Sequence, residues 1–570
     1  MFVPKSIVCL RDYNRETFTK DLFAGITVGV VALPLAMAFA IASGLPPERG
    51  LFTAVVAGFL ISALGGSRVQ IGGPTGAFVV LVGTVAAQYG YNGLVIATIL
   101  AGMLLVVMGL ARFGAMIKFI PLPVVTGFTA GIAVIIFSTQ IRDFFGLTLH
   151  EIPIDFFDKW AQYLLHIDSF NPYSLAVGLG TIVLILGLRR INPRIPGMLV
   201  ALIVAAVATS FWQFPIETIG SRFGNLPRVL PAPSFPTLDW GTIRELISPA
   251  FTIALLAGIE SLLSATVADG MMGTRHKSNV ELVGQGIANI GSAIFGGLPA
   301  TGAIARTATN VKSGGRTPVA GMIHALTLLL IMIAFAPQAK YIPLAALSGI
   351  LMIVAWNMSE IERFRALLRT PRSDVVVLLS TFILTIAVDL TVAVQVGVVM
   401  AALLFMRRMS EVANVGVVTR EFQDSEDKPD PNAIGKKRVP PGVEVFEING
   451  PLFFGAAETF RDTLRTLTTK PKVLIVRMRQ VPVIDATGLQ LLDELHKECK
   501  RDGTQLIFSG VHAQPLVALQ RTGLWDRVGA DNVFGNIDDA LNRARTILGL
   551  PIEAAKHDSE PEVAREKKRP

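Results

Sequence analysis

The sequence is poor in charged residues and in cysteine. Asp, Glu, Lys and Arg make up 16% of its 570 residues, whereas a soluble domain carries about 25%. We therefore expect an integral membrane protein. The two cysteines, Cys9 and Cys499, lie far apart and form no C-x-x-C pair, which excludes a disulfide framework and a cysteine metal site.

The sequence also lacks the short motifs of nucleotide hydrolysis and of common enzymes. It has no phosphate-binding P-loop, no histidine-rich metal spacing and no G-x-S-x-G elbow. We therefore expect neither an enzyme nor ATP-driven transport by this chain alone, and no metal or other cofactor. The net charge is +8, but many basic residues lie in loops between apolar spans. This position indicates a membrane orientation signal and not nucleic-acid binding.

One short motif occurs twice in the chain. Residues 72–77 read G-G-P-T-G-A, and residues 296–303 read G-G-L-P-A-T-G-A. Glycine lets the backbone turn and approach a ligand, proline can open a helix, and a helix N-terminus attracts anions. Two such interruptions at matching places in the halves of a hydrophobic chain are typical of a transporter's binding site. Ordinary breaks between membrane helices are the alternative.

Residues 21–410 alternate between apolar segments and basic loops, after a polar N-terminal segment (residues 1–20) without a cleavable signal. If residues 1–20 are cytoplasmic, every basic cluster falls on the cytoplasmic side. The pattern gives 14 crossings in two sets of seven, so the second set is inverted relative to the first. The expected spans are about 22–44, 51–64, 74–88, 94–110, 123–141, 172–188, 197–212, 249–269, 283–294, the run after 303, 322–336, 342–356 and 375–406, the last folding back near Asp389.

The composition changes after residue 410. Residues 411–441 are polar and predict a linker, residues 442–550 predict a soluble α/β domain, and residues 551–570 predict a disordered charged tail. Strands at 443–448, 473–478 and 505–509 alternate with helices at 455–467 and 489–499, which favours a parallel or mixed sheet.

Glu260 lies near the middle of the span 249–269. A carboxyl group at that depth is costly and is a candidate functional group, so Glu260 is a candidate proton carrier. Ser264 lies one turn later on the same helix face. The alternative is a protonated glutamate that only bonds a neighbouring helix.

Arg306 lies a few residues into the helix that follows the second motif. A cation near a helix N-terminus opposes the helix dipole, and a bound anion or Glu260 would explain its position. An arginine that reaches for the membrane surface is the alternative. Thr75 and Thr301 can donate hydroxyl groups to an oxyanion, although for each alone we favour capping of its own helix.

The motifs resemble those of the SulP sulfate permeases. The resemblance covers V-A-L-P-L-A-M-A-F-A-I-A-S-G-L-P-P-E-R-G-L-F, G-G-P-T-G-A-F, the glutamate span and G-G-L-P-A-T-G-A-I-A-R-T-A-T-N-V. The C-terminal domain is similar to a STAS domain, with I-N-G-P-L-F-F-G at 448–455 and V-I-D-A-T-G-L at 483–489. The resemblance implies a multi-pass α-helical membrane protein of 7+7 inverted repeats divided into core and gate domains. It also implies elevator-like transport and a homodimer in the plasma (inner) membrane, with cytoplasmic termini and STAS domains.

The resemblance implies an anion site between the third and tenth helices. Two positions depart from the family pattern: Leu35 replaces a glutamine of many members, and Ile304 replaces a hydroxyl residue of sodium-coupled bicarbonate members. Those members have aspartate at the position of Glu260, so the chain favours proton over sodium coupling. Carried over by position, the substrate-binding residues are Thr75, Gly76, Ala77, Phe78, Thr301, Gly302, Ala303 and Arg306, and the coupling residues are Glu260 and Ser264.

Together these features predict a secondary anion transporter, a proton-coupled symporter of sulfate or of a dicarboxylate such as fumarate or succinate. The alternatives are a bicarbonate or chloride exchanger, a nucleobase transporter, and a membrane-anchored signalling protein whose STAS domain binds a cytoplasmic partner. Thr487 occupies the position of a phosphorylatable serine in related anti-sigma-factor antagonists. A helix N-terminus at Asp485 and Thr487 is the alternative explanation of that motif.

Overall fold

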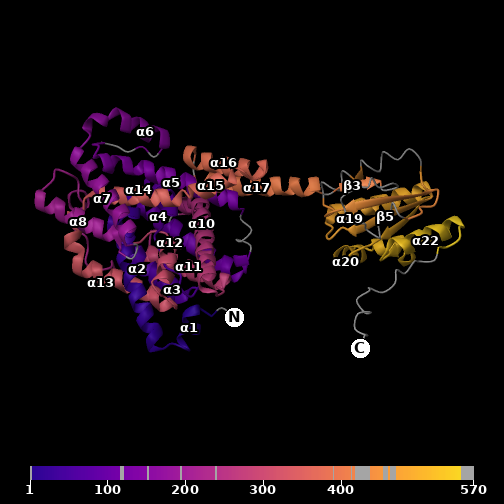
Figure 1. Ribbon diagram of the computed structural model, residues 1–570, viewed down its shortest axis with the longest axis horizontal. Helices are drawn as coiled ribbons and strands as arrows, with labels where there is room; N and C mark the ends of the chain where they lie inside the picture. Colours follow the sequence, from indigo (N-terminus) through magenta and orange to yellow (C-terminus); the bar gives the residue numbers. More distant parts are fainter. Residues whose placement is uncertain are drawn as a thin grey trace, which may run out of the picture. The chain divides into compact units, whose positions relative to one another are not determined.

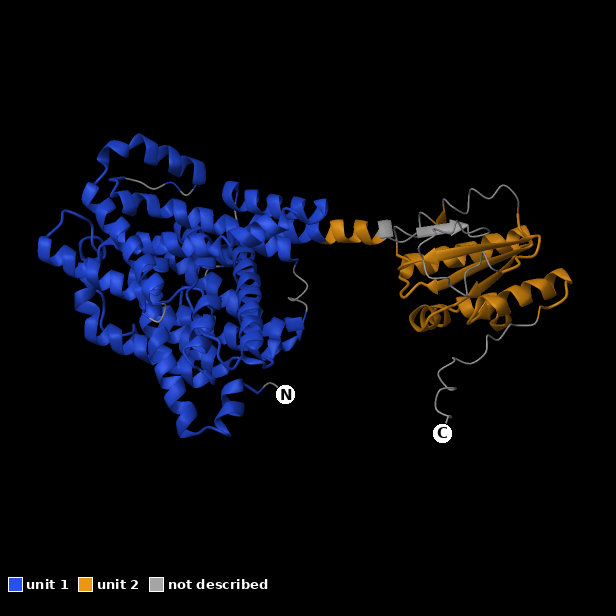
Figure 2. Cartoon of the chain, in the orientation of Figure 1, with its two compact units in different colours: residues 1–401 blue, residues 402–570 orange. Residues whose placement is uncertain are grey.

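The chain forms two compact units, Met1–Ala401 and Ala402–Pro570 (Figure 2). The first unit is helical, and the second contains a mixed sheet. The computed structural model describes residues 3–115, 121–149, 153, 155–192, 195–237, 240–388, 390–412, 414–417, 437–453, 460–461 and 470–553.

The first unit is built from long apolar helices. Within the described ranges, nine helices are long and apolar enough to cross a membrane, and Gly197–Trp212 is a shorter apolar helix. Every predicted span corresponds to a helix or to part of one. The helices at the predicted spans are α2 (Arg15–Ala42), α3 (Pro47–Leu64), α4 (Val79–Leu110), α5 (Leu122–Phe145), α7 (Pro172–Ile191), α8 (Gly197–Trp212), α10 (Trp240–Met272), α11 (Ser278–Ile294), α12 (Ile304–Lys312), α13 (Pro318–Phe335), α14 (Leu344–Met358), α16 (Arg372–Ala387) and α17 (Leu390–Val412). Further elements are α1 (Lys5–Leu10), the 3-10 turn η1 (Gly76–Phe78), α6 (Phe156–Leu165), α9 (Ile219–Phe223) and α15 (Ile361–Leu367).

Proline and glycine set several helix boundaries. Pro47, Pro172 and Pro318 occupy first turns, where a missing N–H group costs no intrahelical hydrogen bond. Gly90 interrupts α4 with a φ of 68°, so α4 comprises the two spans predicted at 74–88 and 94–110.

The predicted turn within residues 375–406 is present. α16 ends at Ala387 and α17 begins at Leu390, while Asp389 itself lies outside the described residues. α10 begins at Trp240, before the predicted start at residue 249, because Pro249 lies inside the helix and does not begin it.

Helix packing repeats between the two halves of the first unit. α2 packs on α13 as α10 packs on α4, and α3 packs on α13 as α11 packs on α4. Likewise, α5 packs on α16 as α7 packs on α14. In each pair, both helices of one contact are replaced by their counterparts from the other half, for example α2 by α10 and α13 by α4. An internal two-fold relation requires this pattern. The predicted fold of inverted repeats is therefore confirmed.

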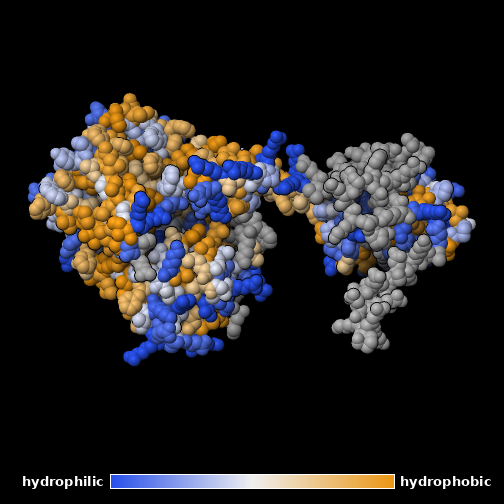
Figure 3. All heavy atoms as spheres, in the orientation of Figure 1, coloured by the Kyte–Doolittle hydropathy of each residue, from blue (hydrophilic) through white to orange (hydrophobic). Residues whose placement is uncertain are grey.

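The same contacts divide the first unit into two sets of helices. α2, α3, α4, α10, α11, α12 and α13 pack mainly on one another, and we call this set the core. α5, α7, α8, α14 and α16 form the second set, the gate. Hydrophobic residues cover much of the visible face of this unit (Figure 3), as expected of helices that contact lipid.

The second unit contains a five-stranded sheet in the order β3–β4–β5–β6–β7. Figure 1 labels two of these strands, β3 and β5. β3 is antiparallel to β4, and the other neighbours are parallel, which confirms the prediction of a parallel or mixed sheet. The strands are β3 (Asn414–Val417), β4 (Val443–Asn449), β5 (Val473–Gln480), β6 (Gln505–Ser509) and β7 (Val533–Phe534), and the helices are α19 (Ala486–Asp502), α20 (Ala513–Arg521), α21 (Leu524–Val528) and α22 (Ile537–Leu548).

Side chains of successive strand residues lie on opposite faces of this sheet, and both faces are apolar. Phe446 and Phe508 pack in a cluster with side chains of α19, α20 and α21. Val445 and Ile507 pack in a second cluster with side chains of α22. Successive strand residues point to opposite faces, so helices cover both sides of the sheet.

The segment 411–441, predicted as a linker, contains a strand. β3 pairs with β4, with Asn414 opposite Asn449 and Val417 opposite Phe446, so folded structure begins before residue 442. Most of this segment, most of the predicted helix at 455–467 and the tail from residue 554 lie outside the described residues.

Candidate functional site

The two copies of the repeated motif are joined by a short antiparallel pairing. β1 (Gly72–Gly73) pairs with β2 (Thr301–Gly302). The Ala303 N–H extends the pairing by donating to the Ile71 carbonyl at 2.8 Å. The pairing brings the start of η1 and α4 beside the start of α12, although the two motifs belong to different halves of the chain.

Both strands require glycine. A Cβ on Gly302 would lie 1.5 Å from Gln70 Nε2, and a Cβ on Gly72 would lie 2.2 Å from Ile61 Cδ1. Gly73 has a φ of 148°, a conformation that other residues rarely adopt. The glycines therefore permit close backbone approach, which ordinary helix breaks do not need.

Each strand leads directly into a helix start. Thr75 precedes η1 and Ala303 precedes α12, and neither residue supplies a side-chain cap. The first N–H groups of a helix have no partner within the helix. Two uncapped helix starts side by side suit a negatively charged ligand.

The first helix start lies where the core meets the gate. Ala77 and Phe78 are buried. A Cβ on Gly76 would lie 2.5 Å from Met358 Sδ on α14 and 3.3 Å from Ile136 Cδ1 on α5. These predicted site residues thus adjoin both sets of helices.

Glu260, on α10, faces the first helix start. Thr75 Oγ1 donates a hydrogen bond to Glu260 Oε2 at 3.2 Å, and Glu260 is partly exposed. The preferred sequence interpretation of Thr75 as a helix cap is therefore wrong, because its hydroxyl group points to α10. The structure brings the predicted coupling residue to a predicted substrate residue.

Arg306 lies beside the same helix start, with 3% of its surface exposed. Its Nη2 donates to the Pro74 carbonyl, whereas Nη1 has no hydrogen-bond partner among the described residues. Glu260 interacts with Arg306 through its charge, but the described salt bridges include no direct pair between them. Arg306 therefore does not reach for the membrane surface, and its buried N–H group is open to an anion.

The hydroxyl groups on the second side are bonded within the core. Thr301 Oγ1 donates to the Ala257 carbonyl at 3.0 Å and lies 2.7 Å from Ser261 Oγ. Ser264 Oγ lies 3.0 Å from Thr307 Oγ1. All four side chains are fully buried. Thr301 therefore holds α10 to β2 and does not cap α12, and the coupling role of Ser264 stays a prediction.

The polar residues that hold the two strands were not among the residues predicted from the sequence. Gln70 Nε2 donates to the Ser261 carbonyl at 3.1 Å. The Ile71 N–H, just before β1, donates to Thr307 Oγ1 at 3.0 Å. Asn289 bonds both backbone groups of Ala300, at 2.8 and 2.9 Å. An uncharged polar residue inside an apolar segment was the available signal, because such a residue needs a partner in a membrane.

The motif in the second unit contains a helix cap. Asp485 accepts a hydrogen bond from the Gly488 N–H at 2.8 Å, which confirms the helix N-terminus predicted as the alternative for this motif. Thr487 is exposed in the first turn of α19. Its phosphorylation stays a prediction.

Family models match both units. The model of the sulfate permease family matches residues 18–381. The chain belongs to the sulfate permease family. The STAS domain model matches residues 436–540 of this family member. It is an anion transporter of this family and not an enzyme, and the described residues contain no group of three or more His, Cys, Asp or Glu that could hold a metal ion.

Curated relatives of this sulfate permease family member extend over nearly the whole chain. "Putative sulfate transporter YvdB" of Bacillus subtilis is 44% identical over 531 residues, covering 93% of this chain and 98% of the relative. "Bicarbonate transporter BicA" of Picosynechococcus is 30% identical over 557 residues, covering 93% and 95%. The chain is thus similar to relatives named for two different anions.

Solved structures share the fold. The murine Solute Carrier 26 family member A9 anion transporter in the inward-facing state has a TM-score of 0.84 at 19% identity, covering 95% of this chain and 94% of that one. The transmembrane domain of a cyanobacterial bicarbonate transporter BicA has a TM-score of 0.61 at 29% identity, covering 68% and 98%. The first unit therefore has a helical membrane transporter fold.

The two departures from the family pattern lie in different environments. Leu35 follows the proline inside α2 and is buried, whereas Ile304 begins α12 with 40% of its surface exposed. Neither side chain offers a polar group. Polar side-chain contacts with a ligand at this site would therefore come chiefly from Arg306, with Thr75 and Glu260 nearby.

Proposed function

We propose that this family member is a proton-coupled symporter of sulfate, with a dicarboxylate such as fumarate or succinate as the second candidate substrate. The observation that carries the proposal is the buried, incompletely bonded Arg306, close to Glu260 but without a direct ion pair. Similarity to a putative sulfate transporter at 44% identity favours sulfate. Both substrates are divalent anions, which suit a fixed cation between two helix starts.

The anion binds between the starts of η1 and α12. Arg306 Nη1 and the uncapped N–H groups of both helix starts donate hydrogen bonds to its oxygens. These donors are held by β1, β2 and the Pro74 carbonyl before the anion arrives. Binding therefore needs little reorganisation, which favours affinity.

Glu260 carries the proton. A bound divalent anion and an ionised Glu260 would repel each other in a site with one arginine, so the anion and a protonated glutamate bind together. After release, an ionised Glu260 offsets the charge of Arg306. Thr75, which donates to Glu260, connects this exchange to the first helix start.

The core carries the bound anion past the gate. Hydrogen bonds of β1, β2 and Gln70 fix the two motifs within the core. The gate meets the first helix start through apolar atoms, near Met358 and Ile136. Such a boundary can slide without breaking hydrogen bonds, and this favours rigid-body, elevator-like alternating access.

Exchange of bicarbonate or chloride is the second candidate function. It is supported by the relative named bicarbonate transporter at 30% identity. Glu260 and Ile304 differ from the residues of the sodium-coupled bicarbonate members, which is why we favour proton coupling. A nucleobase substrate suits the site less well, because neutral rings do not need Arg306.

The membrane arrangement is also proposed. Basic clusters between the spans favour a plasma (inner) membrane protein with cytoplasmic N- and C-termini. The family resemblance supports a homodimer. A cytoplasmic protein partner would bind the STAS domain near the exposed Thr487.

The test is uptake of labelled sulfate and fumarate into proteoliposomes that contain the full chain. Acid outside and alkali inside should drive accumulation, by about tenfold for each pH unit if one net proton drives each anion. The sign follows from the proton being a co-substrate: uptake rises as the outer pH falls. Uptake of neither anion, or uptake indifferent to the gradient, would contradict the proposal.

A matched pair of glutamate substitutions isolates the coupling residue. Glu260→Gln should abolish gradient-driven accumulation, because the amide cannot gain and lose a proton. Glu362→Gln, at an exposed position on α15, should behave like the parent protein. A fully active, gradient-responsive Glu260→Gln protein would refute the proton role.

A further inference from the structure

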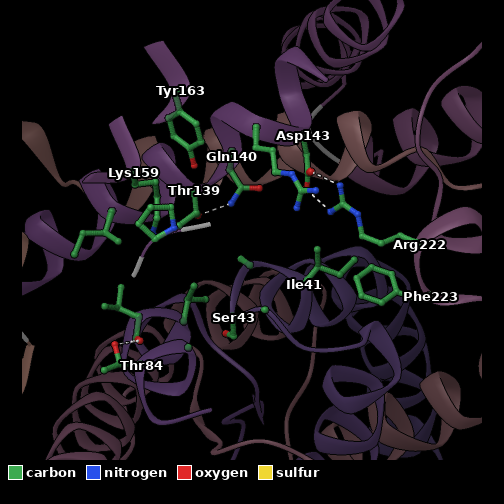
Figure 4. Close-up of a pocket in the computed structure, with 18 residues that line it drawn as sticks. Ile41, Ser43, Thr84, Thr139, Gln140, Asp143, Lys159, Tyr163, Arg222 and Phe223 are labelled. Atoms are coloured by element: carbon green, nitrogen blue, oxygen red, sulfur yellow. Dashed lines mark hydrogen bonds and ion pairs between the residues drawn. The ribbon is translucent and has the colours of Figure 1, made fainter. Parts of the chain in front are cut away.

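The first unit contains a cavity of about 380 Å³ between core and gate, distinct from the site of the repeated motifs. Its core wall comprises the C-terminal end of α2 and the first turns of α4. Its other walls come from α5, α6 and α9 (Figure 4). The wall residues Val79 and Val80 follow Phe78 directly, so the cavity begins beside the central site.

The charged residues in the cavity wall are three cations and one carboxylate. The cations are Arg142, Lys159 and Arg222, and the carboxylate is Asp143. Arg222 is already neutralised, because it bonds both oxygens of Asp143, at 2.6 and 3.0 Å, and also Glu217. Arg142 and Lys159 are therefore the two wall cations that stand outside this ion-paired group.

Lys159 is buried on the short helix α6, with 8% of its surface exposed. Among the described residues it has no hydrogen bond or salt bridge to a carboxylate, and the nearby Asp155 instead caps α6 by accepting from the Phe157 and Asp158 N–H groups. Burial lowers the pKa of Lys159, and the charge of Asp155 opposes that shift. An anion in the cavity would likewise favour the ammonium form.

Arg142, in the last turn of α5, is half-buried and incompletely bonded. Its Nε is buried without a hydrogen-bond partner among the described residues. Arg142 also acts on Tyr163: burial raises the pKa of Tyr163, and the charge of Arg142 opposes that shift. Two cations from different helices, each incompletely bonded, thus line one cavity. A buried cation such as Lys159 is costly without a carboxylate partner, unless a ligand supplies the missing charge.

We propose that this cavity is a second anion-binding site, in which Lys159 and Arg142 hold a hydrated divalent oxyanion, sulfate if the proposed function is correct. The volume exceeds what one such anion fills, so water accompanies it. Under the predicted topology, this site opens to the outer side and loads the central site. It would raise the local concentration of anions without taking part in proton coupling.

A thiol reporter tests the charge of the cavity without any transport measurement. Thr84→Cys, at a wall position, is placed in the full chain with Cys9→Ser and Cys499→Ser. An anionic methanethiosulfonate reagent should modify it about tenfold faster than a cationic one, and sulfate should slow the anionic reagent. Lys159→Met or Arg142→Met should bring the two rates together. Equal rates in the parent reporter, or no protection by sulfate, would overturn the proposal.

A transport measurement tests the direction of loading. In intact cells, Lys159→Met should raise the KM for sulfate about fivefold, while in inverted vesicles the KM should be unchanged. Arg244→Gln, which removes an exposed charge at the start of α10, is the matched control and should change neither. An unchanged KM in intact cells, with sulfate transport present, overturns the loading role.

The two tests separate this inference from the proposed function. If the parent protein transports no sulfate, the proposed function fails, while the thiol reporter still measures anion binding in the cavity. If transport is present and the reporter shows no preference for the anionic reagent, only the second site fails. Arg142→Met replaces Lys159→Met if the latter does not fold.

Discussion

The two copies of the motif share the order of a strand and a helix start, but they differ in local backbone and in side chains. Each consists of a two-residue strand that leads into an uncapped helix start. The first copy supplies Thr75, which donates a hydrogen bond to Glu260. This copy also contacts the gate. The second supplies Arg306, whose guanidinium reaches back to the first copy. Both charged residues of the candidate site, Glu260 and Arg306, therefore belong to the second half of the first unit.

The two glycines that face each other in the strand pair, Gly72 and Gly302, also differ in their surroundings. Gly72 is crowded by Ile61 and Gly302 by Gln70, so one copy packs on an apolar side chain and the other on a polar one. α2 and α10, which open the two halves, differ similarly, since α2 has Leu35 in its buried middle and α10 has Glu260. Specificity and coupling should therefore be more sensitive to changes in the second half.

The largest effect is expected from removing the charge of the second copy. Arg306→Gln should lower sulfate uptake at least about 100-fold, because an uncompensated charge in a buried site costs about 3–5 kcal/mol. Arg306→Lys should recover part of the activity, since it restores the charge without the planar fork. Uptake and the thermal unfolding midpoint are measured together. Substantial uptake by a folded Arg306→Gln protein would show that the two copies are more alike than we propose.

Changes at the paired glycines should have the next largest effect. Gly302→Ala should lower the free energy of unfolding by about 2–4 kcal/mol, because its Cβ collides with Gln70. Gln70→Ala in the same chain should restore part of that stability, but should not rescue Gly72→Ala, whose Cβ meets Ile61. Thermal unfolding of the purified full chain checks both. If Gln70→Ala restored the stability of Gly72→Ala as much as that of Gly302→Ala, the two glycines would not have the different surroundings described here.

The two threonines should separate stability from transport. Thr301→Val should cost about 1 kcal/mol of stability, because its hydroxyl group bonds Ala257 and Ser261 within the core, and should leave the pH dependence of uptake unchanged. Thr75→Val should change that pH dependence, because its hydroxyl group bonds Glu260. Uptake against outer pH and thermal unfolding are the two measurements. A changed pH dependence in Thr301→Val together with an unchanged one in Thr75→Val would contradict these assignments.

The smallest effect is expected outside the motifs, in the STAS domain. Asp485→Ala should lower the free energy of unfolding of this domain by about 1 kcal/mol, through loss of the helix cap. Thr487→Val, at an exposed position, should change it by less than about 0.5 kcal/mol. Neither should alter uptake by purified protein. Loss of uptake in either variant would mean that the asymmetry of the motifs is not the only determinant of transport.

The apolar spans and the paired motifs could be predicted from sequence because their signals are local. A run long enough to cross a bilayer and a Gly/Pro interruption are visible without knowing any neighbour. Even the bend of α4 at Gly90 agrees with the two separate spans predicted there. The position of Glu260 in mid-span was likewise sufficient to identify it as a site candidate.

The orientations of hydroxyl groups could not be predicted in this way. Capping is a local interaction, and the sequence favours it for Thr75, but α10 brings Glu260 close enough to compete. Gln70 and Asn289 bond groups that only the fold places beside them. β3 was missed for a similar reason, since a short strand is stabilised by its partner β4 and not by its own composition.

The pairing of β1 with β2 also constrains how the protein is made. The residues that it brings together are far apart in the chain, with Arg306 and Pro74 separated by 232 positions. During synthesis, the first half must therefore wait with unpaired strand N–H and C=O groups, which are unfavourable in a lipid environment. Contacts of such sequence separation form late. The candidate binding site consequently forms only after β2 and α12 of the second half have joined the first half.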